Sequence, residues 1–374
     1  MAKKQPLDFI LLISVCMLVA IGIIMVFSSS YSYTLVNLGD GYHYLKRVSI
    51  WAVVGTLAMI FFSKVNYWHW SKYANLAFIV SIILLILVLT PLGIERNYAR
   101  RWLGVGESLT FMPSEVAKFA AIIFIPTSIS RKKEKMQTFS QGILPYLMII
   151  GLYFGLIFKQ PDFSTAFVVV VMIFAMVFVG GIKFSHFLSI AGTGVGAITL
   201  LLAYILFSGK GGYKAERITT FLDPWKDPTD KGYQVIQSLL AIGTGGIFGR
   251  GLGRSVQKHF YLPEPQNDFI FSIIAEELGF IGGITVILLF MILIWRGIKI
   301  AMSAPDMLGC LMSTGVITMI AVQVMINIAV ATSSMPATGI PLPFISYGGS
   351  SLVIFMSAIG IVLNISKHTN LDRS

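Results

Sequence analysis

The chain has 374 residues, of which 56% are hydrophobic and 12% are charged, and its formal net charge is +11. Soluble domains carry about 25% charged residues, so half that share, spread over repeated apolar runs, excludes an ordinary water-soluble domain and indicates an integral membrane protein. The excess of positive charge favours an anionic lipid or an anionic substrate as a partner and not nucleic acid, because no soluble domain exists to present a basic face.

Ten apolar runs approach or reach the length of about 17–25 residues that a membrane-spanning helix needs. They begin near Phe9, Val48, Tyr73, Pro113, Gly142, Asp162, Ser185, Asp268, Met307 and Phe344. The first run lacks a small-residue cleavage site and more runs follow it, so it is predicted to be a span and not a signal peptide. The sequence therefore predicts an all-α polytopic membrane protein with about ten transmembrane helices.

The distribution of Lys and Arg predicts the orientation of these helices. The connections on the side of the N-terminus carry more of them, as in the run from Arg131 to Lys135. Because cytoplasmic loops are enriched in these residues, both chain ends are expected in the cytoplasm. Residues 208–267 then form a large extracytoplasmic loop between the seventh and eighth helices, within a single transmembrane domain that covers residues 1–374.

The large loop has two further features. Its stretch "GYQVIQSLLAIGTGGIFG" is typical of a short amphipathic helix followed by glycine-rich backbone that lies on or in the membrane face. Its basic residues are Lys210, Lys214, Arg217, Lys226, Lys231, Arg250, Arg254 and Lys258. Such a basic external face indicates an anionic partner, and the alternative is attraction to anionic lipid headgroups.

Ionisable groups inside membrane spans are functional candidates by default. In "PSEVAKF", Glu115 and Lys118 stand three residues apart near the start of a predicted helix. That spacing places both side chains on one face, where they can pair. The pair is either a purely structural lock between helices or a device that positions a substrate group or a neighbouring acid.

The motif "KQPDFSTA" places a second acid at the start of a span. Asp162 follows a proline turn and is expected to cap the next helix by accepting backbone N–H bonds. Lys159, three residues earlier, is a candidate for binding phosphate.

A third acid stands in "FYLPEPQNDFIFSIIAEELGF", where two prolines hold the approach to the eighth span extended. Asp268 is either the N-cap of that span or a general base held on rigid backbone beside a basic loop. Glu276 and Glu277, further along the same span, are expected to point to different faces and to meet basic or polar groups of other helices, with Lys118 among the possible partners.

The segment from Asn327 to Ser351 contains three prolines and several glycines, which exclude a regular helix. Non-helical backbone at membrane depth occurs only where protein or water satisfies its polar groups. The segment is therefore expected to line a cavity, and its Ser and Thr hydroxyls suit contacts to sugar or phosphate.

Several of these stretches together resemble one known family. The blocks "PSEVAKF", "QPDFSTA", "YLPEPQNDFIF", "AEELGFIGG" and "PLPFISYGGSS", in this order along nearly the whole chain, are similar to those of the SEDS proteins, that is FtsW, RodA and SpoVE. The stretch "GRGLGRSVQKHFYLPEPQ" resembles the sequences of the FtsW and SpoVE branch more than those of RodA.

The resemblance implies a peptidoglycan glycosyltransferase that polymerises lipid II outside the membrane, beside a class B penicillin-binding protein that crosslinks the strand. By the same resemblance, Asp268 matches the essential acid of the family's large outer loop, and Glu115 and Lys118 match its buried ion pair. Asp162 matches the acid of the "QPD" block, and Arg100 matches the family's Arg two residues before Trp.

The residues agree with this chemistry. Joining a sugar hydroxyl to the anomeric carbon of the next sugar needs a base, for which Asp268 is the candidate, and stabilisation of a departing pyrophosphate. Candidates for binding the sugar or the pyrophosphate are Arg100, Arg101, Lys159, Lys118, Glu115 and Asp162. Supporting positions are Glu264, Glu276, Glu277, Asn327, Ser346 and Ser350. No protein metal cage is visible in the sequence, so a divalent cation, Mg²⁺ or Mn²⁺, is an optional aid at the pyrophosphate.

Two other classes of protein remain open at this point. A lipid II flippase would also need intramembrane charges and a polar cavity, although the candidate residues here cluster toward the external half. A scaffold that docks a transpeptidase would need no catalytic acid. The sequence leaves division, elongation and sporulation open as the process that the protein serves.

Overall fold

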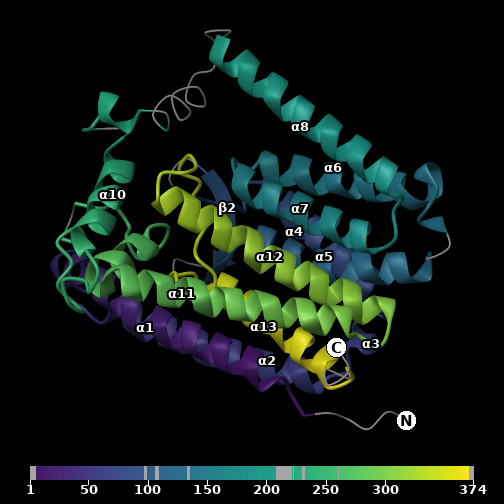
Figure 1. Cartoon of the computed structure of the whole chain (residues 1–374), viewed down its shortest axis with the longest axis horizontal. Helices are drawn as coiled ribbons and strands as arrows, with labels where there is room; N and C mark the ends of the chain where they lie inside the picture. The colour runs from purple at the N-terminus through teal and green to yellow at the C-terminus, as the bar shows by residue number, and fades with distance from the viewer. Residues whose placement is uncertain are drawn as a thin grey trace.

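The computed structural model describes residues 6–96, 99–105, 109–132, 135–207, 221, 223–229, 232–259 and 261–369. Long helices dominate it, and most of them lie side by side in one bundle (Figure 1). They are α1 (Phe9–Leu38), α2 (His43–Lys64), α4 (Ala74–Leu87), α5 (Pro113–Arg131), α6 (Leu144–Phe158), α7 (Phe163–Val179), α8 (Phe184–Phe207), α11 (Ile270–Met302), α12 (Met307–Ala331) and α13 (Gly349–Ser366). Shorter helical pieces are α3 (Tyr67–Trp70), a π-helix at Phe139–Ile143, a 3-10 turn at Pro224–Lys226 and α10 (Tyr233–Gly245).

Each predicted span start lies close to the start of one of these long helices. The largest offset is five residues, at Val48 against His43 and at Phe344 against Gly349. Six described helical segments are long and apolar enough to cross a membrane, namely Phe9–Leu38, His43–Lys64, Phe139–Phe158, Ile270–Met302, Met307–Ala331 and Gly349–Ser366. A mostly helical membrane protein is thus confirmed, while the count of ten spans stays a prediction.

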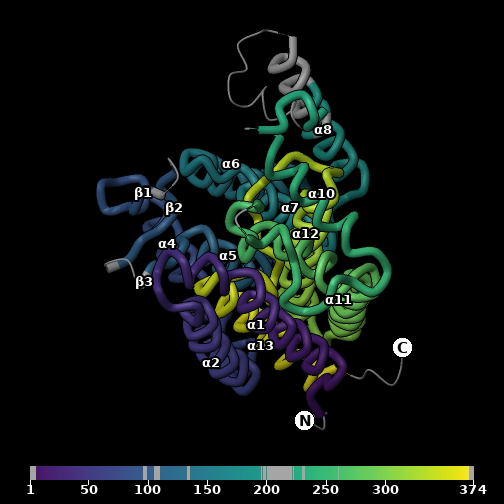
Figure 2. The backbone as a smooth tube through the Cα atoms, turned by 90° about the vertical axis from the view of Figure 1, so that its left-hand side faces the viewer, coloured from purple at the N-terminus to yellow at the C-terminus, as the bar shows by residue number. Residues whose placement is uncertain are grey.

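The all-α description is wrong in one place, between α4 and α5. There the chain forms a three-stranded antiparallel sheet of β1 (Ile94–Arg96), β2 (Ala99–Val105) and β3 (Leu109–Phe111), in the order β1-β2-β3. The run is too short and too polar for a span, and its Ile, Trp, Val, Thr and Phe favour strands. Figure 2 shows the strands at one edge of the bundle.

The two ends of the described chain meet at one end of the bundle. The backbone N–H of Asp8 donates to Ser366 Oγ at 3.3 Å, and the Asp8 carboxylate pairs with Arg296 Nε at 2.5 Å. The N- and C-terminal labels accordingly lie near each other in Figure 1. This agrees with both chain ends lying on one side, and the assignment of that side to the cytoplasm stays a prediction.

The connection between α8 and α11 contains the predicted amphipathic helix as α10, which buries one face that includes Val235, Ile236 and Ala241. Glycine-rich backbone follows it, with several glycines in the left-handed region. α11 itself is not regular, because Gly279 interrupts it with φ +69° and ψ −166°. That interruption lies directly after Glu276 and Glu277 and decides how they are partnered.

Candidate active site

A cavity of about 1010 Å³ lies where α2, β2, α5, α7, the approach to α11 and the start of α13 converge. Most of its charged lining comes from residues that lie far apart in the sequence. The charged lining residues are Arg47, Arg101, Glu115, Asp162, Glu264 and Asp268. The predicted acids of three separate motifs therefore face one space.

Asp268 lies two residues before α11 and is half-buried in this cavity. The N-cap of α11 is Phe269, so the interpretation of Asp268 as an N-cap is wrong. The amide of Asn327, which is buried, donates to the backbone carbonyls of Asp268 at 2.9 Å and of Ile340 at 2.8 Å. These bonds hold the backbone of the acid in place. Gly339, with φ +73°, leaves room beside the carboxylate, since a Cβ there would lie 3.6 Å from Asp268 Oδ2.

Glu115 and Lys118 form the predicted ion pair, with 2.7 Å between Lys118 Nζ and Glu115 Oε1 and side chains that are only 4% and 1% exposed. Lys118 also lies over the ring of Phe355, at 5.3 Å from its centroid. Glu115 lines the cavity, so its carboxylate can accept a hydrogen bond from a ligand while Lys118 balances its charge from the protein side.

Asp162 caps α7 as predicted, because its Oδ1 accepts the backbone N–H of Thr165 at 3.2 Å. The same buried side chain lines the cavity. Capping and lining are therefore compatible roles of one carboxylate. Lys159, by contrast, is exposed at the end of α6 and is not among the residues that line the cavity.

The consecutive arginines of β2 separate as strand neighbours do, because successive side chains point to opposite faces. Arg101 lines the cavity, and its guanidinium donates to the carbonyls of Gln160, at 3.3 Å, and Pro161. Arg100 pairs with Glu95 at 3.0 Å on the exposed face. The structure thus brings Arg101 to the site and leaves Arg100 outside it.

Sequence reasoning missed the contribution of α2. Arg47 lines the cavity together with His43, Tyr44 and Trp51. These positions are separated by one, three and four residues, which places them on one side of a helix. The available signal was the helical spacing of these polar and aromatic residues at the start of α2.

The non-helical stretch between α12 and α13 lines the cavity through Thr338, Gly339 and Pro341, as expected for backbone at membrane depth. Ser350, at the start of α13, also lines it. Ser346 does not, since it is buried and accepts the backbone N–H of Leu342 at 2.8 Å. Ser346 therefore stabilises the local turn.

Glu264 lines the cavity beside Asn267, whose amide donates to its carboxylate at 2.8 Å. The backbone N–H of Tyr347 donates to the carbonyl of Gln266 at 2.9 Å. This bond joins the approach to α11 with the segment before α13, so the two non-helical walls of the cavity support each other.

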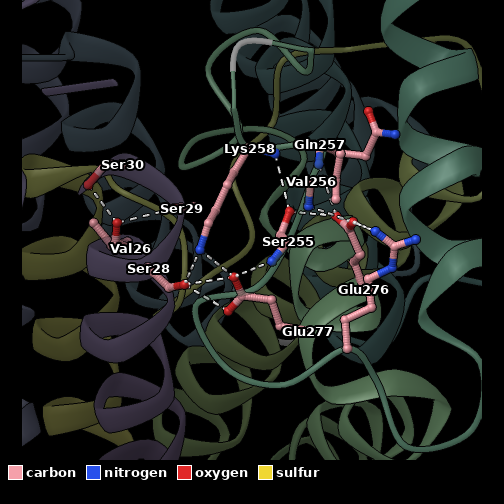
Figure 3. Close-up of polar contacts among 11 residues, drawn as sticks. Val26, Ser28, Ser29, Ser30, Ser255, Val256, Gln257, Lys258, Glu276 and Glu277 are labelled. Carbon is pink, nitrogen blue, oxygen red and sulfur yellow. Dashed lines mark hydrogen bonds and ion pairs between the residues drawn. The ribbon is translucent and has the colours of Figure 1, made fainter. Parts of the chain in front are cut away.

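Glu277 does not line the cavity and is fully buried. Its carboxylate accepts hydrogen bonds from Lys258 Nζ at 2.7 Å, from the Ser28 hydroxyl at 2.7 and 2.8 Å, and from the backbone N–H of Ser255 at 3.3 Å (Figure 3). The prediction that Lys118 is among its partners is wrong, because Lys118 pairs with Glu115. The cation beside Glu277 is Lys258, which the large loop supplies by folding back over α11.

Glu276, also fully buried, is enclosed by the same loop. It accepts the Ser255 hydroxyl at 2.5 Å and the backbone N–H groups of Val256 at 2.8 Å and Gln257 at 3.4 Å, and Arg250 lies 3.7 Å away. We call the contacts of Glu276 and Glu277 with Ser28, Arg250 and residues 255–258 the loop anchor. Lys258 is the buried cation of the loop anchor, and Arg250, which is exposed, adds a second positive charge at its edge.

The predicted basic face of the large loop supplies no cation to the cavity from the residues that the structure describes. Lys226 lies 4.0 Å from Asp223, Arg250 and Lys258 belong to the loop anchor, and Arg254 is exposed. The other predicted cations, Lys210, Lys214, Arg217 and Lys231, lie outside the described residues. The described cations that line the cavity are Arg47 and Arg101.

The sequence matches a known protein family and several curated proteins over nearly its whole length. Residues 9–371 match the family model described as cell cycle protein, which covers FtsW, RodA and SpoVE. The chain is 45% identical to Stage V sporulation protein E of Bacillus subtilis over 98% of this chain and 99% of that protein. It is 41% identical to the probable peptidoglycan glycosyltransferase FtsW of Trichlorobacter lovleyi, over 97% of this chain and 94% of that protein.

Solved structures give the same result. The chain is similar to the rod shape determining protein RodA of Thermus thermophilus, with a TM-score of 0.70 and 27% identity over 96% of both chains. It is also similar to a chain in a structure that describes the coordination of polymerization and crosslinking by a peptidoglycan synthase complex, with a TM-score of 0.78 and 29% identity over 96% of this chain and 97% of that chain.

Proposed function

The chain belongs to the family of FtsW, RodA and SpoVE cell cycle proteins and is a peptidoglycan glycosyltransferase, and we propose that it polymerises lipid II at the outer face of the bacterial cytoplasmic membrane. Lipid II is the undecaprenyl-pyrophosphate-linked disaccharide-pentapeptide. The observation that carries the proposal is the position of Asp268, half-buried in a cavity that also presents two guanidinium groups.

Asp268 is the proposed general base. Its carboxylate takes the proton of the attacking sugar C4 hydroxyl as the oxygen forms a bond to the anomeric carbon of the second sugar. The side-chain amide of Asn327, on α12, donates to the backbone carbonyl of Asp268. This bond fixes the position of the base before the substrate binds, so binding does not have to order it.

The leaving group is the pyrophosphate, and it departs with the electrons of the broken C1–O bond. Arg47 and Arg101 line the same cavity, and guanidinium groups bind phosphate oxygens in a bidentate manner. Their fixed positive charge stabilises the negative charge that develops on the pyrophosphate. Attack opposite an α-linked pyrophosphate gives a β-linked product with inversion in one displacement, and no covalent enzyme intermediate is required.

Glu115 and Asp162 are proposed to act on the sugar and not on the pyrophosphate, because carboxylates repel phosphate and accept hydroxyl hydrogen bonds. Both side chains are buried and held from the protein side, Glu115 by Lys118 and Asp162 by its helix. Their positions are therefore fixed before the substrate binds.

A divalent cation fits this site only in part. The described residues contain no group of three or more His, Cys, Asp or Glu side chains that could hold a metal ion. Mg²⁺ is often held by one or two carboxylates, with waters and substrate phosphates as its other ligands, so Mg²⁺ or Mn²⁺ would need the pyrophosphate as a ligand. When bound, the ion would neutralise the leaving group, and the steps above do not depend on it.

A class B penicillin-binding protein is the proposed partner that crosslinks the new strand. The similarity to a chain of a peptidoglycan synthase complex supports this pairing. The named relatives include both FtsW and a stage V sporulation protein, and division and sporulation are the proposed settings.

The test is polymerisation of fluorescent lipid II by the purified full-length protein in detergent, where flipping across a bilayer has no meaning. We expect D268N to lose activity by about 10²–10⁴-fold, the usual contribution of a general base. Glu95→Gln is the matched control, since it neutralises an exposed carboxylate that pairs with Arg100 outside the cavity.

The outcomes separate the alternatives. Full activity of D268N with an unchanged melting temperature would reject the catalytic role of Asp268. No polymer from the unaltered protein, even with a class B penicillin-binding protein present, would instead favour a flippase or a scaffold.

A further inference from the structure

The break in α11 is closed by a separate piece of chain, residues 246–253, which we call the glycine segment. The non-helical backbone of Gly279 leaves N–H groups in the following turn without helical acceptors. The N–H of Phe280 donates to the carbonyl of Gly246 at 2.8 Å, and the N–H of Ile281 donates to that of Ile247 at 3.2 Å. The second half of α11 is therefore capped by the glycine segment.

The bonding is reciprocal on the other side of the break. The N–H of Arg250 donates to the carbonyl of Glu276, and the N–H of Gly251 donates to that of Glu277, both at 3.0 Å. The N–H of Gly249 also donates to the carbonyl of Gly245, the last residue of α10, at 2.9 Å. Four backbone hydrogen bonds therefore join the glycine segment to α11 across the break.

Glycine is required for this contact. A Cβ at Gly249 would lie 2.2 Å from the carbonyl oxygen of Glu277, and a Cβ at Gly279 would lie 2.3 Å from the N of Gly249. Gly249 also has φ +78°, which other residues rarely adopt. The two backbones therefore lie directly against each other, and the side chains of the segment must point elsewhere.

Those side chains are apolar and face outward. Phe248 is 81% exposed, and Ile247 and Leu252 are also exposed. Phe280 and Ile281, on the turn of α11 that the segment caps, are exposed as well. This patch is more apolar than a loop in water tolerates.

The patch continues into the exposed surface of α11. This helix is long and apolar enough to cross a membrane, and its exposed residues after the patch along the chain include Leu288, Met291 and Trp295. Arg254, exposed at the other margin of the glycine segment, suits the level of lipid phosphates.

We propose that the glycine segment is a membrane wedge whose Ile247, Phe248 and Leu252 side chains insert among phospholipid acyl chains next to α11, with Arg254 at the headgroups. Irregular backbone is tolerated at this depth only when its polar groups are satisfied by protein, and the reciprocal bonds across Gly279 supply protein partners for part of these groups. The loop anchor (Figure 3) then joins the wedge to the part of the loop that leads to Asp268.

The test uses nitroxide labels on the full-length protein in vesicles of phosphatidylcholine and phosphatidylglycerol. Single cysteines replace Phe248, Leu252 or Arg254 in a chain that carries C16A and C310A. Collision rates with oxygen, which concentrates in acyl chains, are compared with those of a water-soluble nickel chelate. Met291→Cys, exposed on α11, is the lipid control, and Lys226→Cys, exposed and charged, is the water control.

If the segment is a wedge, the ratio of the collision rate with oxygen to that with the nickel chelate should be similar for labels at 248, 252 and 291. The ratio for the label at 254 should lie closer to that of the label at 226. Equal ratios at 248 and 226 would place the segment in water and overturn the proposal. Exclusion of both reagents at 248 and 252 would also overturn it, because a protein surface would then cover the patch.

Discussion

Two groups of acids in this molecule have different surroundings, although α11 and the residues just before it carry members of both. Asp268 faces a cavity that Glu115 and Asp162 also line. Glu276 and Glu277, on the following helix, do not line this cavity and are enclosed by hydroxyls, backbone N–H groups and cations of the loop anchor. The first group leaves space for a ligand, whereas the second leaves none.

The difference qualifies the rule that ionisable groups in membrane spans are functional candidates. A buried charge needs compensation in either case. What separates the groups is how fully their carboxylate oxygens are paired. Both oxygens of Glu276 and of Glu277 accept hydrogen bonds in the loop anchor, whereas Glu115 Oε2 is buried and has no hydrogen-bond partner among the described residues. Complete compensation within the chain indicates a structural role.

The largest effect on stability is expected at the loop anchor. Lys258→Met leaves Glu277 as an uncompensated buried charge, and breaking such a pair costs about 3–5 kcal/mol. We expect a corresponding drop in the free energy of unfolding of the purified protein in detergent. Lys226→Met is the control, because Lys226 is exposed and its oxygen partner lies 4.0 Å away.

A double variant sharpens this measurement. Lys258→Met with Glu277→Gln removes both charges, so it should be more stable than Lys258→Met alone. If Lys258→Met unfolds like the unaltered protein but loses polymerisation, Lys258 belongs with the cavity residues and the division between the two groups fails.

A smaller effect is expected from the arginines of β2, which test the cavity side of the comparison. Arg101→Ala should lower kcat/KM for lipid II by between about tenfold and about 100-fold, because a hydrogen bond to a charged group contributes about 1.5–3 kcal/mol. Arg100→Ala should leave kcat/KM unchanged, since Arg100 pairs with Glu95 outside the cavity. Equal effects of the two substitutions would contradict the assignment of Arg101 alone.

Local patterns were sufficient to predict much of the fold. Apolar runs located the long helices within five residues, and the spacing of Glu115 and Lys118 predicted their pair. Both inferences depend only on neighbours along a helix. The strands between α4 and α5 were missed because each is short and the run was assigned to an external connection.

Long-range contacts limited the prediction of the site. Nothing near Glu277 in the sequence identifies Lys258 and Ser28 as its partners, because a fold-back of the loop across the break at Gly279 brings them together. Arg47 was missed for the same reason, since α2 reaches the cavity only through tertiary packing. Charges could be located in the sequence, but their partners depended on the fold.

The smallest expected effect is at Asp162, the one residue whose side chain serves both purposes. Asp162→Ala removes the cap of α7 and should cost about 1 kcal/mol of stability, whereas Asp162→Asn keeps an oxygen acceptor and should cost little. If the charge serves the substrate, both variants lose polymerisation although only Asp162→Ala loses stability. Chemical unfolding and the lipid II assay on the same preparations check this. A fully active Asp162→Asn protein would mean that the carboxylate acts as a cap alone, which would move Asp162 into the structural group with Glu276 and Glu277.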